Sequence, residues 1–236
     1  MKVADWPAAA VVIAAYEEAD SIGRTLDSLD GQDAEVIVVV GGDDGTDDIA
    51  TEHPAVDRVL PDEEEDGPSA ARNQGARAAD APVVCFTDAD TVVPNHWVAK
   101  HRRHYTDDDV VGVGGPLRPT EDSTKHRVLF KLLTDYWYRA AWPVGFVQQS
   151  GNNCSYRRSA FLDADGFDEE IPFMEDTELS LRMKQYGRVV YDKECPVYTS
   201  TRRQSDQGYL GLFLIYARGY LDYFVLGRRP DDGYFK

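Results

Sequence analysis

The chain has 236 residues, a length typical of one large α/β domain or of two small ones. Hydrophobic residues make up 42% of it and aromatic residues 11%, which is enough for a sizeable core and excludes wholesale disorder. Acidic residues outnumber basic residues by 42 to 25, which gives a formal net charge of −17. Because such a charge repels phosphate backbones, we expect no nucleic acid partner. The excess of Asp over Glu resembles the acidic surfaces of proteins from high-salt cytoplasm, where screening weakens self-repulsion.

Cysteine usage and the first residues of the chain bear on its location. Cys85, Cys154 and Cys195 are far apart and form no CxxC pair, so neither a zinc site nor a disulfide framework is predicted. Residues 1–7 contain one Lys but lack the long apolar core of a signal peptide. We therefore expect a reduced, cytoplasmic location.

The first half of the chain alternates between strand and helix patterns. Apolar runs bounded by turn residues predict buried strands, and apolar residues at helical spacing, preceded by capping residues or proline, predict helices. This alternation predicts an α/β fold with a mostly parallel sheet flanked by helices, and a ligand site beyond the carboxyl ends of the strands. From about residue 123 the alternation stops and helices mix with loops. In chain order, the predictions are a strand at 8–15, a helix from about 22, a strand at 36–40, a helix at 69–79, a strand at 83–87, a helix at 96–105 and a weaker strand at 110–113.

Acidic clusters follow three of these predicted strands. Carboxyl ends of parallel strands meet at one edge of a sheet, so the clusters would repel one another unless a cation or a ligand's donors lay between them. Carboxylates are suitable ligands for Mg²⁺ or Mn²⁺, which could bridge them to a diphosphate. For any one cluster, a turn or a helix cap is the alternative, and for the second cluster the two interpretations are about even. The clusters are Glu17 and Glu18, Asp43 and Asp44, and Asp88 and Asp90.

Several motifs together resemble the family 2 glycosyltransferases, which are inverting enzymes of GT-A fold that use nucleotide-diphosphate sugars. The matches run in the family's order from about residue 9 to residue 187, which is most of the chain. They are Val-Val-Ile-Ala-Ala-Tyr-Glu-Glu at 11–18, Gly-Asp-Asp-Gly-Thr-Asp-Asp at 42–48, Ala-Arg-Asn-Gln-Gly at 71–75, Asp-Ala-Asp at 88–90, Gly-Asn-Asn at 151–153, Gly-Phe-Asp-Glu at 166–169 and Glu-Asp at 175–176.

The resemblance implies a set of residues around the donor. Asp43 is expected to accept a hydrogen bond from the base, which suits a uracil or guanine edge, although Gly42 stands where the family often has an acid. Arg72 is expected to help hold the donor, because its planar fork suits either a phosphate or an orienting carboxylate; a surface ion pair is the alternative. The other residues expected to contact the donor are Ala15, Tyr16, Glu17, Asp44 and Asp88.

The resemblance also implies a divalent metal at the strand end. Asp90 is expected to bind Mg²⁺ or Mn²⁺, with Asp88 contributing beside it, and the metal would offset charge on the departing diphosphate. Some family members add a late His as a metal ligand, but residues 198–204 contain none. Arg202 and Arg203 could neutralise the diphosphate instead, or they could simply balance the acidic surface.

On the acceptor side, the resemblance points to a general base. Asp176 is expected to take the proton of the acceptor hydroxyl, and Glu175 to orient the acceptor or raise the proton affinity of Asp176. By pattern alone, these two acids indicate the first turn of a helix. Gly151 and Asn152 are expected to contact the acceptor. The implied organisation is a GT-A domain at 1–205, with a nucleotide-sugar-binding half at 8–115 and an acceptor-side half at 116–205, followed by a helix and tail at 206–236.

Residues 209–226 form an apolar stretch near the end of the chain. As a helix it would span roughly 27 Å, but Arg218 and Asp222 near its middle would each cost about 2.5–3.5 kcal/mol at a membrane centre. Two interpretations remain: a helix lying in the membrane interface, and a helix packed on the domain or on a second subunit. The first predicts a peripheral protein on the inner face of the membrane.

The expected function is metal-dependent, inverting transfer of a sugar from a nucleotide-diphosphate donor. The acceptor implied by the family is a lipid-linked or surface-glycan sugar, or a polyprenyl phosphate. Two alternatives stay open at this point. One is a nucleotidyltransferase of similar fold, against which the acidic turn after residue 16 counts. The other is a family member that binds a nucleotide sugar without turnover.

Overall fold

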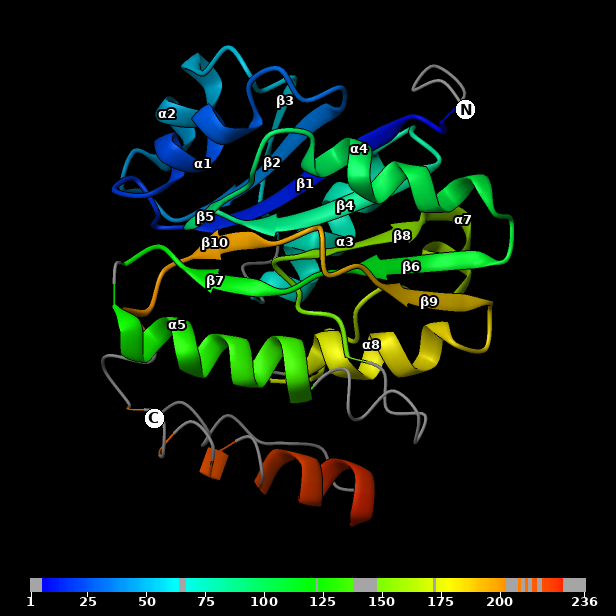
Figure 1. Cartoon of the computed structure of the whole chain (residues 1–236). Helices are drawn as coiled ribbons and strands as arrows, with labels where there is room; N and C mark the ends of the chain where they lie inside the picture. The colour runs from blue at the N-terminus through cyan, green and yellow to red at the C-terminus, as the bar shows by residue number, and fades with distance from the viewer. Residues whose placement is uncertain are drawn as a thin grey trace.

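The structure is a computed structural model, and its main feature is a seven-stranded sheet of order β3-β2-β1-β4-β8-β6-β9 in the described part of the chain (Figure 1). All neighbouring pairs are parallel except those of β8, which runs antiparallel to both β4 and β6. The strands are β1 (Ala9–Tyr16), β2 (Glu35–Gly41), β3 (Arg58–Pro61), β4 (Val83–Asp88), β6 (Val110–Gly114), β8 (Cys154–Arg157) and β9 (Arg188–Tyr191). The described residues are 6–63, 67–121, 123–137, 148–171, 173–202, 208, 211, 214, 215 and 218–226.

The apolar runs form strands because both faces of the sheet are buried. Along β1, Val11 and Ile13 enter the core on one face, whereas Ala10 and Val12 enter the core on the other. The predicted mostly parallel α/β sheet is therefore confirmed. The sequence pattern did not indicate β3, β8 and β9, which have only four residues each.

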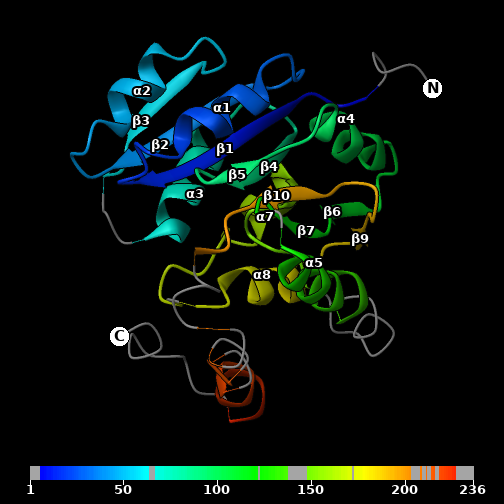
Figure 2. The same ribbon diagram turned by 60° about the vertical axis from the view of Figure 1, so that its left-hand side comes forward.

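Helices cover both faces of the sheet (Figures 1 and 2). Apolar residues of α1 and α4 pack on one face, and those of α7 and α8 pack on the other, which α3 also covers. The helices are α1 (Ile22–Leu29), α2 (Thr46–Glu52), α3 (Pro68–Ala78), α4 (Trp97–Arg102), which continues into the 3₁₀ turn η2 (Arg103–Thr106), α5 (Thr124–Phe130), which continues into the π-helical η3 (Lys131–Trp137), α7 (Arg158–Asp163) and α8 (Glu175–Met183).

A small second sheet returns the chain to the carboxyl end of β4. Its order is β5 (Thr91–Val92), β10 (Val197–Thr199) and β7 (Leu117–Pro119), with β10 antiparallel to β5 and parallel to β7. Because β5 follows directly after Asp90, this sheet places residues 200–202 beside the acidic strand end. The predicted division near residue 115 falls between β6 and β7, while the main sheet continues through β8 and β9 on either side of β6. The division into two halves stays a prediction.

The described part of the 209–226 stretch packs on the domain. Ile215 and Tyr220 contact Phe173 and Met174 in the loop before α8, and a π-helical turn, η5 (Leu221–Val225), follows. Its other side is exposed, with Leu214 59% and Leu221 50% accessible. Within the described residues we find no helix that is both long enough and apolar enough to span a membrane.

A glycine in α3 permits the close approach of this helix to the sheet. A Cβ atom at Gly75 would collide with Val12 of β1 and lie 3.3 Å from Val39 of β2. A Cβ at Gly23 in α1 would meet no described atom within 4 Å. We predict that Gly75→Ala lowers the free energy of unfolding by about 1–3 kcal/mol through overpacking.

The matched control is Gly23→Ala, for which we expect a gain of up to about 1 kcal/mol because alanine has the higher helix propensity. Denaturant titration of both variants provides the comparison. Equal effects of the two substitutions would contradict this account of how α3 packs on the sheet.

Candidate functional site

The centre of the candidate site is a buried arginine in α3. Nη2 of Arg72 donates to Oδ1 of Asp88 at 2.7 Å, and Nη1 donates to Oε1 of Glu175 at 3.1 Å. The side chain is 5% exposed, and its guanidinium lies 5.4 Å from the centroid of the Phe167 ring. Burial alone would lower the pKa of Arg72, but the charges of Asp88 and Glu175 raise it above its ordinary value. One cation thus joins the end of β4 to the start of α8.

Arg72 also fixes the loop that carries Gly151. A Cβ atom at this glycine would lie 3.2 Å from the guanidinium carbon, so the backbone of the loop rests against the arginine. The N–H of Gly151 then donates to Oδ2 of Asp176 at 3.1 Å. The predicted acceptor-side residues Gly151, Glu175 and Asp176 are therefore brought together around Arg72.

Asp176 has the environment of a group that can exchange a proton near neutral pH. Burial and the adjacent charge of Glu175 raise its pKa to about 7, against the opposing effects of the Gly151 N–H, Arg72 and the Thr177 N–H. Oδ1 of the same carboxyl accepts from the Thr177 N–H at 2.6 Å. These bonds fix the orientation of the carboxyl group while its proton affinity stays high. Asp176 is thus suited to act as a general base.

The acidic end of β4 holds excess negative charge. Burial and the charges of Asp88 and Glu18 raise the pKa of Asp90 to about 6, although Arg202 opposes this shift. Arg202 itself donates to Oε1 of Glu18 at 2.9 Å. The predicted residues Asp88, Asp90 and Arg202 therefore lie together, whereas Arg203 is outside the described residues.

The residues at this strand end fit a divalent cation. Among the described residues no group of three or more His, Cys, Asp or Glu side chains is arranged to hold a metal. Mg²⁺ is commonly held by one or two carboxylates together with substrate phosphates, and Asp90 with Asp88 supplies such a pair. Burial and then the repulsion from Asp88 and Glu18 raise the pKa of Asp90, and a bound metal ion would relieve that repulsion as a proton does.

The turn after β2 is built partly by its own acids. Oδ1 of Asp44 accepts from the N–H of Thr46 at 3.0 Å, and Oδ2 accepts from the N–H of Ala19 at 3.0 Å. Hydrogen bonds from Thr46 and Ala19 lower the pKa of Asp44. Asp44 thus forms the turn, which was the alternative to ligand binding for the cluster of Asp43 and Asp44. The Asp43 side chain is exposed.

Gly42 lies in the same turn and has a conformational reason to be glycine. Its φ is 84°, and a Cβ there would lie 2.7 Å from Cγ of Glu17. The ends of β1 and β2 therefore lie close together, and Tyr16 at the end of β1 is 55% exposed. Donor contacts by Ala15, Tyr16, Glu17, Asp43 and Asp44 stay predictions.

Two of the motifs are joined by hydrogen bonds that the sequence did not indicate. Nδ2 of Asn73 donates to the Phe167 carbonyl at 2.9 Å and to Oε1 of Glu169 at 2.7 Å, and Oδ1 accepts from the Phe167 N–H at 2.9 Å. The motifs at 71–75 and 166–169 are thus partners in space.

On the acceptor side, Nδ2 of Asn152 donates to Oγ1 of Thr199 at 3.3 Å. This bond connects the Gly151 loop to β10.

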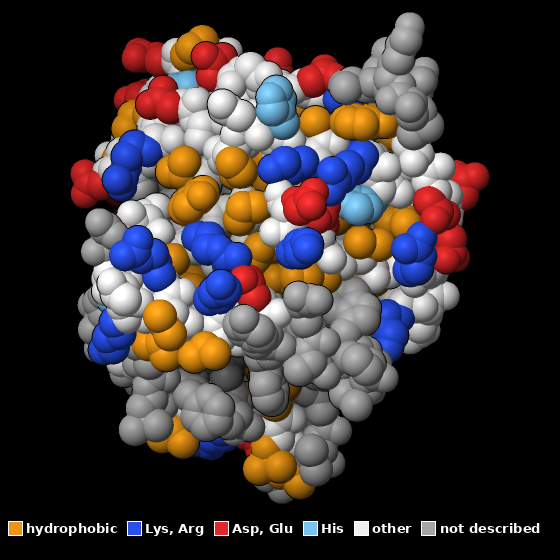
Figure 3. Space-filling model, viewed as in Figure 1, with side chains coloured by type: hydrophobic (Ala, Val, Ile, Leu, Met, Phe, Trp, Pro, Cys, Tyr) orange, Lys and Arg blue, Asp and Glu red, His pale blue; other side chains and the backbone are white. Residues whose placement is uncertain are grey.

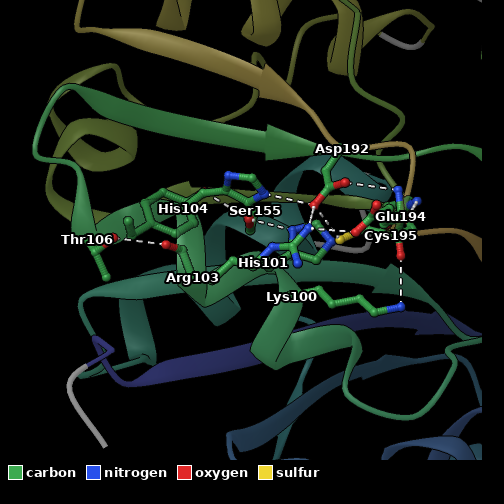
Figure 4. A network of polar contacts seen from close by, with 11 residues as sticks. Lys100, His101, Arg103, His104, Thr106, Ser155, Asp192, Glu194 and Cys195 are labelled. Carbon is green, nitrogen blue, oxygen red and sulfur yellow. Dashed lines mark hydrogen bonds and ion pairs between the residues drawn. The ribbon is translucent and has the colours of Figure 1, made fainter. Parts of the chain in front are cut away.

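A second polar network supports the connection between β9 and β10 (Figure 4). Oδ2 of Asp192 accepts from Arg103 at 2.6 Å and lies 2.8 Å from Nε2 of His104. Burial would raise the pKa of Asp192, but bonds from His104, the Glu194 N–H and Arg103 hold it well below its usual range. Because Asp192 lies 88 residues from His104 along the chain, no local sequence pattern indicates this pair.

His101 in the same region is a core residue. Its Nδ1 lies 2.8 Å from the hydroxyl of Ser155, and burial lowers its pKa to about 3, so it is neutral at ordinary pH. The network around Asp192 fixes the segment between β9 and β10, and Arg202 follows shortly after the end of β10.

The comparisons with known proteins agree with this geometry. Residues 10–164 match the model of glycosyl transferase family 2. The Haloferax volcanii glucosyl-dolichyl phosphate glucuronosyltransferase is 27% identical over 212 residues, covering 79% of this chain and 67% of that protein. The Mycobacterium tuberculosis pre-mycofactocin glycosyltransferase is 30% identical over 191 residues, covering 75% of this chain but only 39% of that protein.

Solved structures share the fold at lower identity. A mannosyltransferase from Pyrobaculum calidifontis in complex with GDP-Man and Mn²⁺ has a TM-score of 0.71 at 20% identity, covering 100% of this chain and 68% of that one. S. aureus TarS in complex with UDP has a TM-score of 0.63 at 18% identity, covering 82% of this chain and 60% of that one. These similarities establish the GT-A fold.

Arg72 should be essential to stability because its buried guanidinium bonds to two partly buried acids, Asp88 and Glu175. Arg72→Met keeps the length of the stem but leaves Asp88 and Glu175 without their cation. We predict a loss of about 3 kcal/mol in the free energy of unfolding, the lower end for a buried pair because the Asp88 side chain is 36% exposed. The matched control is Arg188→Met, since Arg188 is half exposed and pairs with acids at the surface. That substitution should cost less than about 1 kcal/mol.

Denaturant titration measures both variants, and the double variant Arg72→Met with Glu175→Gln should recover part of the loss. An Arg72→Met protein as stable as the control would contradict the account.

Proposed function

Because the chain belongs to glycosyl transferase family 2 and is a glycosyltransferase by that membership, we propose that it moves a sugar from a nucleotide-diphosphate donor to a hydroxyl of a lipid-linked sugar. The family membership decides against the nucleotidyltransferase alternative. The observation that carries the choice of acceptor is Asp176, a fixed carboxyl whose pKa is raised to about 7. A sugar hydroxyl must lose a proton as it attacks, whereas a polyprenyl phosphate is already ionised near neutral pH and hardly needs a base.

The proposed reaction is a single displacement with inversion. Asp176 takes the proton of the acceptor hydroxyl while the hydroxyl oxygen bonds to the anomeric carbon of the donor sugar. The bond from that carbon to the diphosphate breaks, and the nucleoside diphosphate leaves with the electron pair. Asp88 and Asp90 would hold Mg²⁺ or Mn²⁺, which as a Lewis acid offsets charge on the leaving group. Arg202 lies close enough to Asp90 to lower its pKa and is a further candidate to neutralise the diphosphate.

A lipid-linked acceptor is supported by the relatives and by the surface. The names of two relatives contain dolichyl phosphate, in one case as glucosyl-dolichyl phosphate, which is a sugar on a lipid carrier. Val128 and Leu132 are 51% and 52% exposed on α5 and η3, one helical turn apart, and Leu214 and Leu221 are exposed near the end of the chain. We therefore include peripheral contact with the inner face of the membrane in the proposal.

The charge distribution supports the same proposal. Lys and Arg side chains gather around apolar ones on the face that carries the small sheet, with a few acids among them and more acids toward its edges (Figure 3). Tyr198 of β10 is exposed on this sheet and pairs with Arg118 of β7. An acidic chain with such a face has one side that suits anionic headgroups.

The experiment that tests the function is a transfer assay with the full chain. UDP-, GDP- and dTDP-sugars are offered with a polyprenyl-linked monosaccharide or with polyprenyl phosphate, in high KCl and with or without Mn²⁺ or Mg²⁺. We expect transfer to the lipid-linked sugar with one class of nucleotide and dependence on the metal. Asp90→Asn should abolish transfer and the metal's effect on nucleotide affinity with the fold intact by circular dichroism.

Full activity in EDTA would refute the metal assignment. Binding of a nucleotide sugar without turnover on any acceptor would instead support the non-catalytic alternative.

Asp176→Asn isolates the proton transfer, because it keeps the shape of the side chain. We predict a fall in kcat of roughly 10²-fold or more with donor affinity nearly unchanged. The wild-type kcat/KM should rise with pH through about 7, since below this pKa the carboxyl is protonated and cannot accept the acceptor's proton. The rise should be absent in the variant.

Glu178→Gln is the matched control, because Glu178 lies in the same helical turn and pairs with Arg182. It should retain activity. A near-normal rate with Asp176→Asn would rule out the base and indicate a phosphate acceptor, and weakened donor binding would place Asp176 on the donor side.

A further inference from the structure

The C-terminal segment packs on the loop that presents the proposed base. Phe173 and Met174 are buried against Ile215 and Tyr220. Gly219 is also buried, and a Cβ atom there would lie 2.8 Å from Sδ of Met174 and 3.1 Å from the ring of Phe173. The close contact therefore depends on a glycine in the C-terminal segment.

Met174 is held in a conformation that its side chain disfavours. Its φ is 70°, in the left-handed region, at the position just before Glu175 and Asp176. Such a conformation costs a non-glycine residue about 1–3 kcal/mol and persists only where its surroundings determine it. Met174 is 4% exposed, and its surroundings include Gly219. The backbone angle at Met174 sets the direction in which α8 begins, and hence the place of Asp176.

The same segment also reaches the second loop of the site. The hydroxyl of Tyr220 donates to Oε1 of Gln148 at 2.8 Å, and Gln148 is 5% exposed. Three residues further on, the N–H of Gly151 donates to Asp176. Two neighbouring residues, Gly219 and Tyr220, thus contact both of the segments that meet at the carboxyl group of Asp176.

From this arrangement we propose that Gly219 and Tyr220 are positioning residues for the reaction, which place Asp176 by clamping residues 173–174 and Gln148. The inference rests on the proposed function, because it assigns the C-terminal segment a part in catalysis without contact with either substrate. It also implies that the segment acts on the acceptor half of the reaction and leaves donor binding unchanged.

The test compares two glycines of the same segment in the full chain. Gly219→Leu forces the segment away from Met174, whereas a Cβ at Gly211 meets no described atom within 4 Å, so Gly211→Leu is the matched control. We expect kcat to fall about 10²-fold in Gly219→Leu, as for a base misplaced by about 1 Å, with the donor KM nearly unchanged. Gly211→Leu should keep the wild-type kcat.

Hydrogen exchange provides a readout that needs no turnover. Amides of residues 173–180 should exchange faster in Gly219→Leu than in Gly211→Leu or the wild type, because the conformation of Met174 loses its support. This measurement tests whether Gly219 supports residues 173–180 even if the wild type transfers no sugar. Failure of this inference and failure of the proposed function therefore give different results.

Tyr220→Phe provides a gentler variant in case Gly219→Leu does not fold. It removes one hydrogen bond and keeps the ring, and we expect a fall in kcat of about 2- to 10-fold with an unchanged donor KM. The inference is overturned if Tyr220→Phe keeps the wild-type kcat, or if folded Gly219→Leu matches Gly211→Leu in both kcat and exchange.

Discussion

The site depends on one buried cation that has two anionic partners. Arg72 comes from a helix, Asp88 from a strand end and Glu175 from the first turn of another helix, and the guanidinium bonds to both carboxylates with 5% of its side chain exposed. Leaving this buried guanidinium without its carboxylates would cost several kcal/mol, so the three elements are fixed relative to one another. Because Gly151 rests against the same guanidinium, the loop that binds Asp176 is fixed as well.

This constraint separates the two carboxylates, Asp90 and Asp176, to which we assign different tasks in the proposed reaction. Asp90 lies beside Asp88 and Glu18, where excess negative charge favours a divalent cation. Asp176 lies on the other side of Arg72, where burial and Glu175 keep its proton affinity high. In the proposed reaction, a rigid link between them would hold the donor's leaving group and the acceptor's base at a fixed separation, as a single displacement requires. The C-terminal segment completes this frame through Met174.

Much of this arrangement was predictable from the sequence. The apolar runs at 8–15, 36–40 and 83–87 predicted the parallel sheet, because strands buried on both faces carry continuous apolar residues. The short strands β3, β8 and β9 left no such signal, and β8 pairs out of chain order. The motif residues could be named, but not their partners: Arg72 and Glu175 are 103 residues apart, and no local pattern links them. The contact of Gly219 with Met174 could not be predicted from the sequence either, because the role of a glycine in close packing depends on its neighbour in space.

Arg72 joins the two sides of the site through its bonds to Asp88 and Glu175, and we expect these bonds to remain when other residues hold the diphosphate of the donor. A crystal structure of the protein with Mn²⁺ and its nucleotide-diphosphate sugar would test this most directly. We expect the guanidinium of Arg72 to keep its bonds to Asp88 and Glu175, with the metal on Asp90 and the diphosphate beyond the reach of Arg72. An Arg72 side chain that leaves Glu175 and bonds to the diphosphate would contradict it.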